Sequence, residues 1–177
     1  MSKEKIINAN VGDVFTIAGM EFIRFPEVNG KVPVVMKGCA FQSEFGNGTD
    51  LRESTVLKKL EEKVLPNIIE AVGEENVCKF QTDLSTWDGL KVYGVLESRI
   101  SIPTMDFYRT NVEIFDKYKE DSWWWLATAD SAKLHYDSPF VLCVSPSGDV
   151  LSGFCRYGGG VRPILFFEST IFGSSEE

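Results

Sequence analysis

The chain has 177 residues, of which 44% are hydrophobic and 25% charged, a composition that fits one domain with its own core and excludes a disordered segment. Its 18 Lys and Arg stand against 26 Asp and Glu, and the net charge of −8 without a basic run disfavours direct binding of DNA or RNA. Acidity suits a cationic protein partner, although it also keeps a cytoplasmic protein soluble.

No stretch of the sequence approaches the roughly 20 apolar residues of a membrane span, and its start does not resemble a signal peptide. We therefore expect a cytoplasmic protein without membrane contact. The cysteines Cys39, Cys78, Cys143 and Cys155 form no C-x-x-C pair, and His135, the single histidine, lies near none of them. Because zinc sites need Cys and His at short spacings, we expect reduced thiols, no metal and no cofactor.

The N-terminal part predicts a strand meander over residues 11–38. Apolar runs at 13–18 and 20–25, separated by one glycine, are typical of a hairpin. A third strand is expected at 32–36, and its proline, Pro33, favours a position at the sheet edge because proline donates no hydrogen bond.

A long helix is predicted over residues 50–73. Its apolar residues recur at spacings of three and four: Leu57, Leu60, Val64, Ile68 and Val72. Asp50 can cap the helix, with Glu53 as the capping-box partner. Pro66 should kink the helix or start a second segment, and Gly73 should end it.

The middle of the chain predicts shorter elements. Residues 90–96 and 98–102 read as a pair of strands, and short helices are expected at 105–109 and 111–118.

The C-terminal residues 121–168 form a predicted β-rich module. Strands are expected at 123–128, 140–145, 150–155 and 161–167. Gly148 supplies the turn between the second and third strands, and the glycines at 158–160 are expected to form a flexible loop. The tail at 173–177 should fray. Residues 1–177 thus predict one domain.

The order of the motifs resembles a bacterial and phage domain family of unknown function. That family carries a short helix start, W-x-L-R-S-P, a V-x-x-x-G-x-x hairpin and G-V-R-P, which correspond here to residues 102–108, 123–128, 144–150 and 160–165. Ala127 and Thr128 replace the family's Arg and Ser, so no role of that arginine is carried over. The resemblance implies a location in the cytoplasm of a bacterial host cell.

The W…G…R-P ending also looks like the C-type-lectin-like fold. The resemblance implies an α+β fold with a mixed or antiparallel sheet, one long kinked helix and one or two short helices. It further implies a ligand surface in the loops at 130–160, between the tryptophan strand and the Arg-Pro strand. The residues expected to contact a ligand or partner are Asp130, His135, Tyr136, Arg156, Tyr157 and Trp124.

Other residues in this module have expected structural roles. Consecutive tryptophans in a strand alternate between faces, so one or two belong in the core, Trp125 among them, while Trp124 can anchor a partner. We expect Arg162 to hold the C-terminal strand through carbonyls or a carboxylate, with anion binding as the alternative. Gly148 and Pro163 shape the turns.

Catalytic and calcium-binding alternatives receive little support. Cys143 and Cys155, the cysteine candidates of a formylglycine-generating type of enzyme, fall out of register because mirror pairing puts Cys143 opposite Leu151 or Ser152. His135 is accompanied by no recognised nucleophile motif. Asp83 and the segment 86–89 lack the spacing of calcium ligands.

Three functions remain open at this point. The first is a non-catalytic binding module that contacts a protein or small ligand. The second is a phage counter-defence inhibitor, similar to an anti-CRISPR protein, whose acidic surface blocks a nucleic-acid-binding host protein. The third is the formylglycine-generating type of enzyme.

Overall fold

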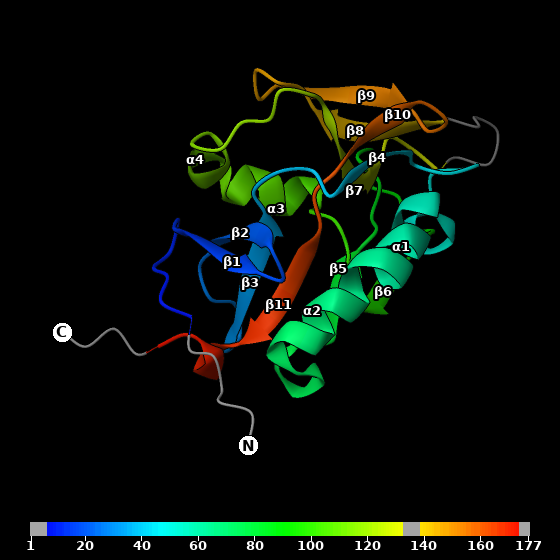
Figure 1. Cartoon of the computed structure of the whole chain (residues 1–177). Helices are drawn as coiled ribbons and strands as arrows, with labels where there is room; N and C mark the ends of the chain where they lie inside the picture. Colours follow the sequence, from blue (N-terminus) through cyan, green and yellow to red (C-terminus); the bar gives the residue numbers. More distant parts are fainter. Residues whose placement is uncertain (1–6, 133–138, 174–177) are drawn as a thin grey trace.

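The computed structural model describes residues 7–132 and 139–173 and shows an α+β fold (Figure 1). The described strands form a four-stranded sheet in the order β1-β2-β3-β11, a five-stranded sheet in the order β4-β10-β7-β8-β9, and the pair β5-β6. The strand bounds are β1 (Val14–Ile17), β2 (Met20–Arg24), β3 (Lys31–Met36), β4 (Phe41–Glu44), β5 (Phe80–Asp83), β6 (Val95–Ser98), β7 (Trp124–Ala129), β8 (Phe140–Val144), β9 (Val150–Phe154), β10 (Gly158–Val161) and β11 (Ile164–Glu168). The helical segments are η1 (Leu51–Glu53), α1 (Thr55–Lys59), η2 (Leu60–Val64), α2 (Leu65–Val72), η3 (Glu74–Asn76), α3 (Met105–Thr110), α4 (Val112–Phe115) and η4 (Ser169–Ile171).

The N-terminal hairpin of β1 and β2 is confirmed, but the edge position predicted for the third strand is wrong. β3 lies inside its sheet, between β2 and β11. Pro33 is tolerated there because the residue opposite it, Phe25, lies just beyond the end of β2 at Arg24. The N–H of Phe25 still donates to the Pro33 carbonyl at 2.9 Å, and only the return bond is lost.

The long helix is confirmed, with a later start than residue 50. Asp50 caps only the 3-10 turn η1, and Ser54, in extended conformation, then caps α1 by accepting from the N–H of Leu57 at 3.0 Å. Ahead of Pro66 the helix widens into the π-helical segment η2, so the disturbance that the proline causes is spread over one turn. Gly73 ends the helix with a φ of 90°.

The strand pair predicted at 90–96 and 98–102 is wrong, because β5 pairs with β6 instead. Gly89, with a φ of 90°, turns the chain just before the predicted first strand, and Gly94, with a φ of 64°, turns it within that strand. The helix at 105–109 is confirmed as α3, and the helix expected at 111–118 is shortened to α4.

The tryptophan strand and the β8–β9 hairpin are confirmed, whereas the predicted glycine loop at 158–160 is in fact strand β10. β10 lies beside β7 as a parallel neighbour, with Gly160 opposite Trp124. After Arg162 and Pro163 the chain enters the other sheet as β11. The Arg-Pro segment therefore leaves the tryptophan sheet instead of continuing it.

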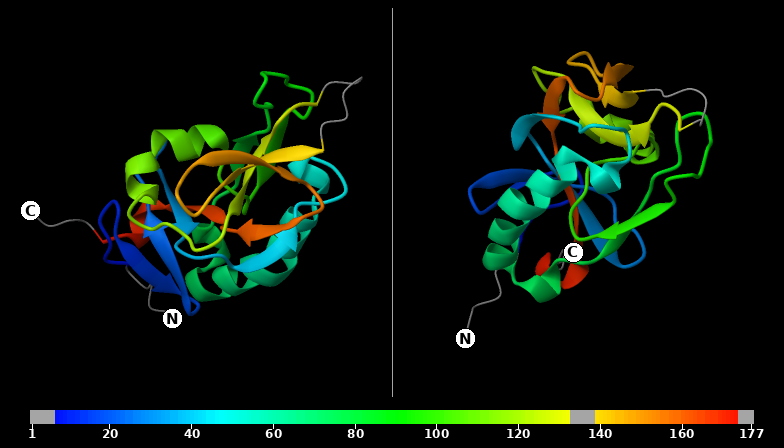
Figure 2. Two further views of the ribbon diagram at one scale, coloured as in Figure 1. Left: turned by 90° about the horizontal axis from the view of Figure 1, so that it is seen from above. Right: turned by 90° about the vertical axis from the view of Figure 1, so that its right-hand side faces the viewer.

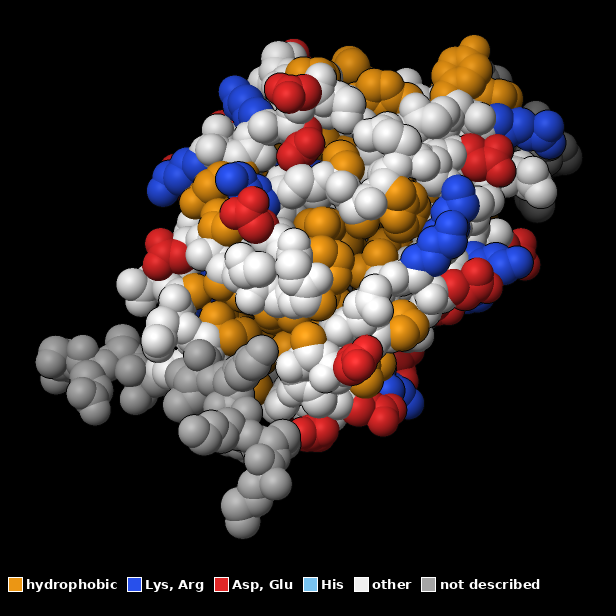
Figure 3. All heavy atoms as spheres, in the orientation of Figure 1, with side chains coloured by type: hydrophobic (Ala, Val, Ile, Leu, Met, Phe, Trp, Pro, Cys, Tyr) orange, Lys and Arg blue, Asp and Glu red, His pale blue; other side chains and the backbone are white. Residues whose placement is uncertain are grey.

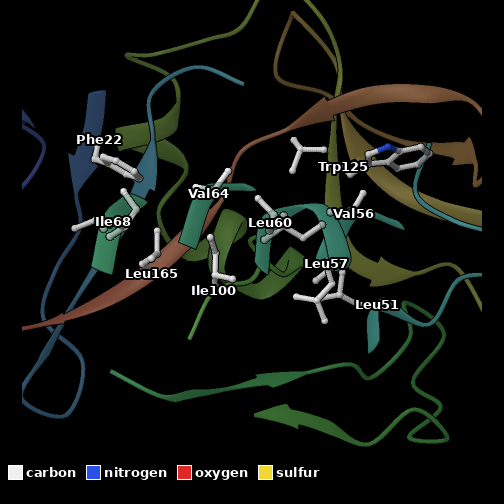
Figure 4. Close-up of a cluster of buried hydrophobic side chains, with 14 of the residues drawn as sticks. Phe22, Leu51, Val56, Leu57, Leu60, Val64, Ile68, Ile100, Trp125 and Leu165 are labelled. Atoms are coloured by element: carbon white, nitrogen blue, oxygen red, sulfur yellow. The ribbon is translucent and has the colours of Figure 1, made fainter. Parts of the chain in front are cut away.

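Two hydrophobic clusters fill the two sides of the sheets. Trp125 belongs to the cluster beneath α1, η2 and α2 (Figure 4), and Trp124 to the cluster beneath α3 and α4. Figure 2 shows the long helix on one side of the sheets and the two short helices on another. The two ends of the described chain also meet, because Ile7 bridges to Phe172.

Candidate functional site

Two of the predicted contact residues, Asp130 and Tyr157, lie near the end of the β8–β9 hairpin. The Asp130 N–H donates to the Phe140 carbonyl at 3.0 Å, and its carboxylate accepts from the hydroxyl of Ser152 at 3.2 Å. Tyr157 is 65% exposed and packs edge-on against Phe154, which in turn contacts Phe140. An aromatic strip of Phe140, Phe154 and Tyr157 therefore runs along this end of the sheet.

The remaining predicted contact residues have different outcomes. Arg156 is exposed beside Tyr157. His135 and Tyr136 lie outside the described residues. The surface role predicted for Trp124 is wrong, because its side chain is only 2% exposed. Alternation along β7 turns Trp124 toward α3 and α4, where it packs against Tyr108.

Arg162 occupies the structural position predicted for it. Its Nε donates to the Met36 carbonyl at 3.1 Å and its Nη2 to the Lys37 carbonyl at 2.8 Å and the Tyr118 carbonyl at 3.5 Å. The guanidinium stacks over Trp124 at 4.7 Å. Burial lowers its pKa to about 10. The side chain thus ties the crossing between the two sheets to three surrounding segments.

The glycines of β10 make room for two tryptophans. A Cβ at Gly159 would lie 2.5 Å from the ring of Trp123 and 2.7 Å from the Nε1 of Trp125. That Nε1 donates to the Ser43 carbonyl in β4 at 3.0 Å, across the position of β10. Trp125 is fully buried, as its predicted structural role requires.

The thiols are poor nucleophiles in this structure. Burial is the main cause that raises the pKa of Cys39, Cys78 and Cys143 to about 11, and it also raises the pKa of Cys155. Cys143 pairs with Leu151, so the predicted register of the hairpin is confirmed. Cys155 lies four residues further along, which separates the two thiols by on the order of 13 Å along the strand.

A cleft of about 510 Å³ opens between β5, α3 and β11, and sequence reasoning did not find it. Its lining comes from four separate stretches of the chain: Phe80, Gln81, Thr82, Asp83, Ser85, Thr86, Trp87, Ile102, Pro103, Thr104, Met105, Asp106, Phe107, Arg109, Thr128, Ile164 and Phe166. Aromatic and aliphatic side chains are thus combined there with hydroxyl and charged groups.

Trp87 lines this cleft and is 56% exposed, although it is the largest side-chain type. Its N–H donates to the Ala129 carbonyl at 2.8 Å, which fixes the loop against the end of β7. The Asp88 carboxylate accepts from the hydroxyls of Thr86 and Ser131. An exposed indole on a firmly held loop indicates a contact residue.

The charged groups of the cleft are predominantly acidic. Asp83 accepts from the N–H and hydroxyl of Ser85 at 2.9 and 2.6 Å, and these bonds lower the pKa of its carboxyl group. Asp106 and Arg109 form an exposed ion pair. The two carboxylates and one guanidinium leave a net charge of −1.

One sequence signal did point toward this cleft. Asp83 and residues 86–89 lack the spacing of calcium ligands, but a tryptophan that stands between polar residues is itself a sign of a contact site. Within the described part of the chain, no group of three or more His, Cys, Asp or Glu side chains is arranged to hold a metal ion.

A second hollow, of about 350 Å³, lies between β1 and the end of α2. It is lined by Ile7, Asn8, Phe15, Thr16, Ile17, Ala18, Ala71 and Val72, none of them charged. Figure 3 shows hydrophobic side chains gathered in a hollow across this face of the molecule.

No protein-family model, curated protein or solved structure matches the chain. In residues 7–132 and 139–173, no helix has both the length and the apolar character needed to cross a bilayer.

Proposed function

We propose that the chain is a non-catalytic binding module whose cleft receives an arginine or lysine side chain of a protein partner. The observation that carries the proposal is the cleft itself, in which exposed Trp87 and the carboxylates of Asp83 and Asp106 accompany apolar walls. Its volume of about 510 Å³ falls within the range of roughly 300–1,000 Å³ that is typical of ligand sites.

Each part of a cationic side chain has a counterpart in the cleft. The aliphatic stem would pack on Phe107 and Phe166, and the cation would stack on Trp87, an arrangement worth about 0.5–2 kcal/mol. Asp83 is ionised at neutral pH, and the hydrogen bonds from Ser85 that lower its pKa further favour the charged form. An anionic ligand would instead meet a site of net negative charge.

The aromatic strip of Phe140, Phe154 and Tyr157 would extend the contact surface. It adjoins the cleft through the backbone, since the Asp88 N–H donates to the Asp130 carbonyl at 3.4 Å. In the C-type-lectin-like arrangement that we propose for the fold, the ligand surface falls at residues 130–160. Here that stretch includes the β8–β9 hairpin in addition to loops.

The protonated, separated thiols of Cys143 and Cys155 support a binding role over the formylglycine-generating type of enzyme. The same cleft chemistry would also serve a counter-defence inhibitor, because a nucleic-acid-binding host protein presents arginine and lysine side chains on its surface. Binding to such a partner should weaken with added salt.

The test is an NMR titration of the ¹⁵N-labelled chain with the blocked tripeptides Gly-Arg-Gly and Gly-Glu-Gly. We expect the arginine peptide to shift amide signals within residues 80–87 and 102–109, and the glutamate peptide to leave them in place. Trp87→Ala should weaken binding roughly 2- to 30-fold, as loss of a cation–π contact predicts. Asp83→Asn should also weaken binding of the arginine peptide, because it removes a negative charge from the cleft.

Val28→Ala is the control, because it shortens an exposed apolar side chain outside both the cleft lining and the aromatic strip. It should leave the affinity for the arginine peptide unchanged. Equal shifts with both peptides, or full affinity in Trp87→Ala, would refute the proposed cleft chemistry.

A further inference from the structure

β9 forms one edge of the five-stranded sheet, and its hydrogen bonds show which backbone groups face outward. The Ser145 N–H donates to the Asp149 carbonyl, and the Cys155 N–H donates to the Pro139 carbonyl. In an antiparallel pair, hydrogen-bonded positions alternate along each strand. The odd-numbered residues of β9 therefore face β8, and the even-numbered residues direct their N–H and C=O groups away from it.

The outward residues are Val150, Ser152 and Phe154. Only the Phe154 carbonyl is used, by the N–H of Tyr157 at 2.9 Å. In the described part of the chain, the other backbone groups on this edge have no hydrogen-bond partner. Five residues of β9 thus present an open template for another strand.

This edge also lacks the features that usually prevent strand pairing. The sequence Val150-Leu151-Ser152-Gly153-Phe154 contains no charge and no proline, and Leu151 is 52% exposed. The edge of β6 is already partly occupied, because the Arg52 guanidinium donates hydrogen bonds to the carbonyls of Tyr93 and Val95. The edge of β1 faces the end of α2.

We propose that β9 pairs antiparallel with β9 of a second copy of this chain, with Ser152 opposite Ser152 of that copy. The two five-stranded sheets then join into one continuous sheet about a two-fold axis. This register uses all three outward residues of each strand. The inference does not depend on the function proposed for the cleft.

Side-chain sizes favour this register. Leu151 falls opposite Gly153 of the second copy, so a large side chain meets a residue without one. An added Cβ at Gly153 would lie 3.0 Å from the ring of Trp125 and 3.4 Å from the ring of Trp123. Trp125 is fully buried, so the leucine of the other copy would pack over Gly153 and the half-buried Trp123.

The strand itself also carries no charge. Val150–Phe154 contains no Asp, Glu, Lys or Arg, so pairing with a second copy brings no like charges of the two strands opposite each other.

The contact is smaller than a standard interface, which buries about 800 Å² per partner. We therefore expect a dimer that dissociates at micromolar concentration. Sedimentation equilibrium from roughly 5 to 500 µM should show the mass rising from 19.9 kDa toward twice that value.

Ser152→Pro is the decisive variant, because the Ser152 N–H points away from β8 and its loss breaks no bond within the chain. It should remain a monomer throughout this range. Ser152→Ala, which loses the side-chain bond to Asp130 but keeps the N–H, should dimerise like the parent. Leu151→Lys should also be monomeric, and Val11→Lys, at another exposed apolar residue, should not.

The register has its own test. Ser152→Cys should form an intermolecular disulfide under mild oxidation, because paired Cα atoms about 5.5 Å apart can be bridged. Leu151→Cys should not, since the two introduced thiols sit diagonally, with Cα atoms roughly 7–8 Å apart. A parent chain that stays monomeric, or dimers that persist in Ser152→Pro, would overturn the proposal, and equal cross-linking would overturn its register.

Discussion

At the scale of single residues, the absence of a side chain decides the packing of β10. Gly159 leaves space for Trp123 and Trp125, and Gly160 leaves space for the Sγ of Cys39, which would lie 2.5 Å from an added Cβ. A run of three glycines in a sequence suggests a flexible loop, as we expected. In the structure these glycines form β10 beside β7, where Gly159 makes room for the rings of Trp123 and Trp125.

Gly159→Ala should destabilise the fold by about 1–3 kcal/mol, because an added methyl group forces buried indoles to move. Urea unfolding followed by circular dichroism measures the change. Gly158→Ala is the matched control on the same strand, since nothing lies within 4 Å of its added Cβ. Equal losses in the two variants would contradict this packing argument.

Thiol burial gives a prediction at alkaline pH. Burial raises the pKa of Cys143 from 9.0 to about 11, so the unfolded chain releases this proton first. The resulting stabilisation is complete below pH 9 and is lost as the pH rises to about 11. Cys143→Ala should therefore flatten the fall in unfolding free energy between pH 9 and 11, as urea titrations at several pH values would show. If the unfolding free energy of Cys143→Ala fell with pH as steeply as that of the parent chain, this role of the Cys143 thiol would be contradicted.

At the scale of elements, local signals placed most helices and strands but misjudged several ends. The spacing of Leu57, Leu60, Val64 and Ile68 identified the long helix, and continuous runs of aromatic and aliphatic residues identified β7 and β8. The capping-box pattern at Asp50 was misleading because Ser54 offers a second cap four residues later. Two capping residues so close together cannot be ranked from the sequence, since either can satisfy the free N–H groups.

Ser54→Ala should cost about 1 kcal/mol of stability, because the hydroxyl both accepts from the Leu57 N–H and donates to the Leu51 carbonyl. Thermal unfolding monitored by calorimetry provides the comparison. Asp50→Ala, which removes the cap of η1 and an exposed ion pair with Arg52, should cost less. A larger loss of stability in Asp50→Ala than in Ser54→Ala would favour the helix start predicted at residue 50.

At the scale of the whole molecule, contacts between distant segments were beyond local patterns. The sequence predicts one strand over 161–167, whereas Val161 ends β10 beside β7 and Ile164 begins β11 in the other sheet. The change of sheets at Arg162 and Pro163 depends on contacts between distant segments, which local patterns do not contain. The cleft escaped detection for the same reason, because its walls come from segments near residues 85, 105 and 165 that only the tertiary structure unites.

The position of β10 and β11 has a consequence for assembly during synthesis. β10 separates β4 from β7, and β11 completes the side of β3 that faces away from β2. Until residues 158–168 have left the ribosome, neither sheet can close, however much of the preceding chain is already available. Both sheets are then completed in a single late step, and a nascent chain stalled before that point would expose two unfinished apolar surfaces to chaperones at once.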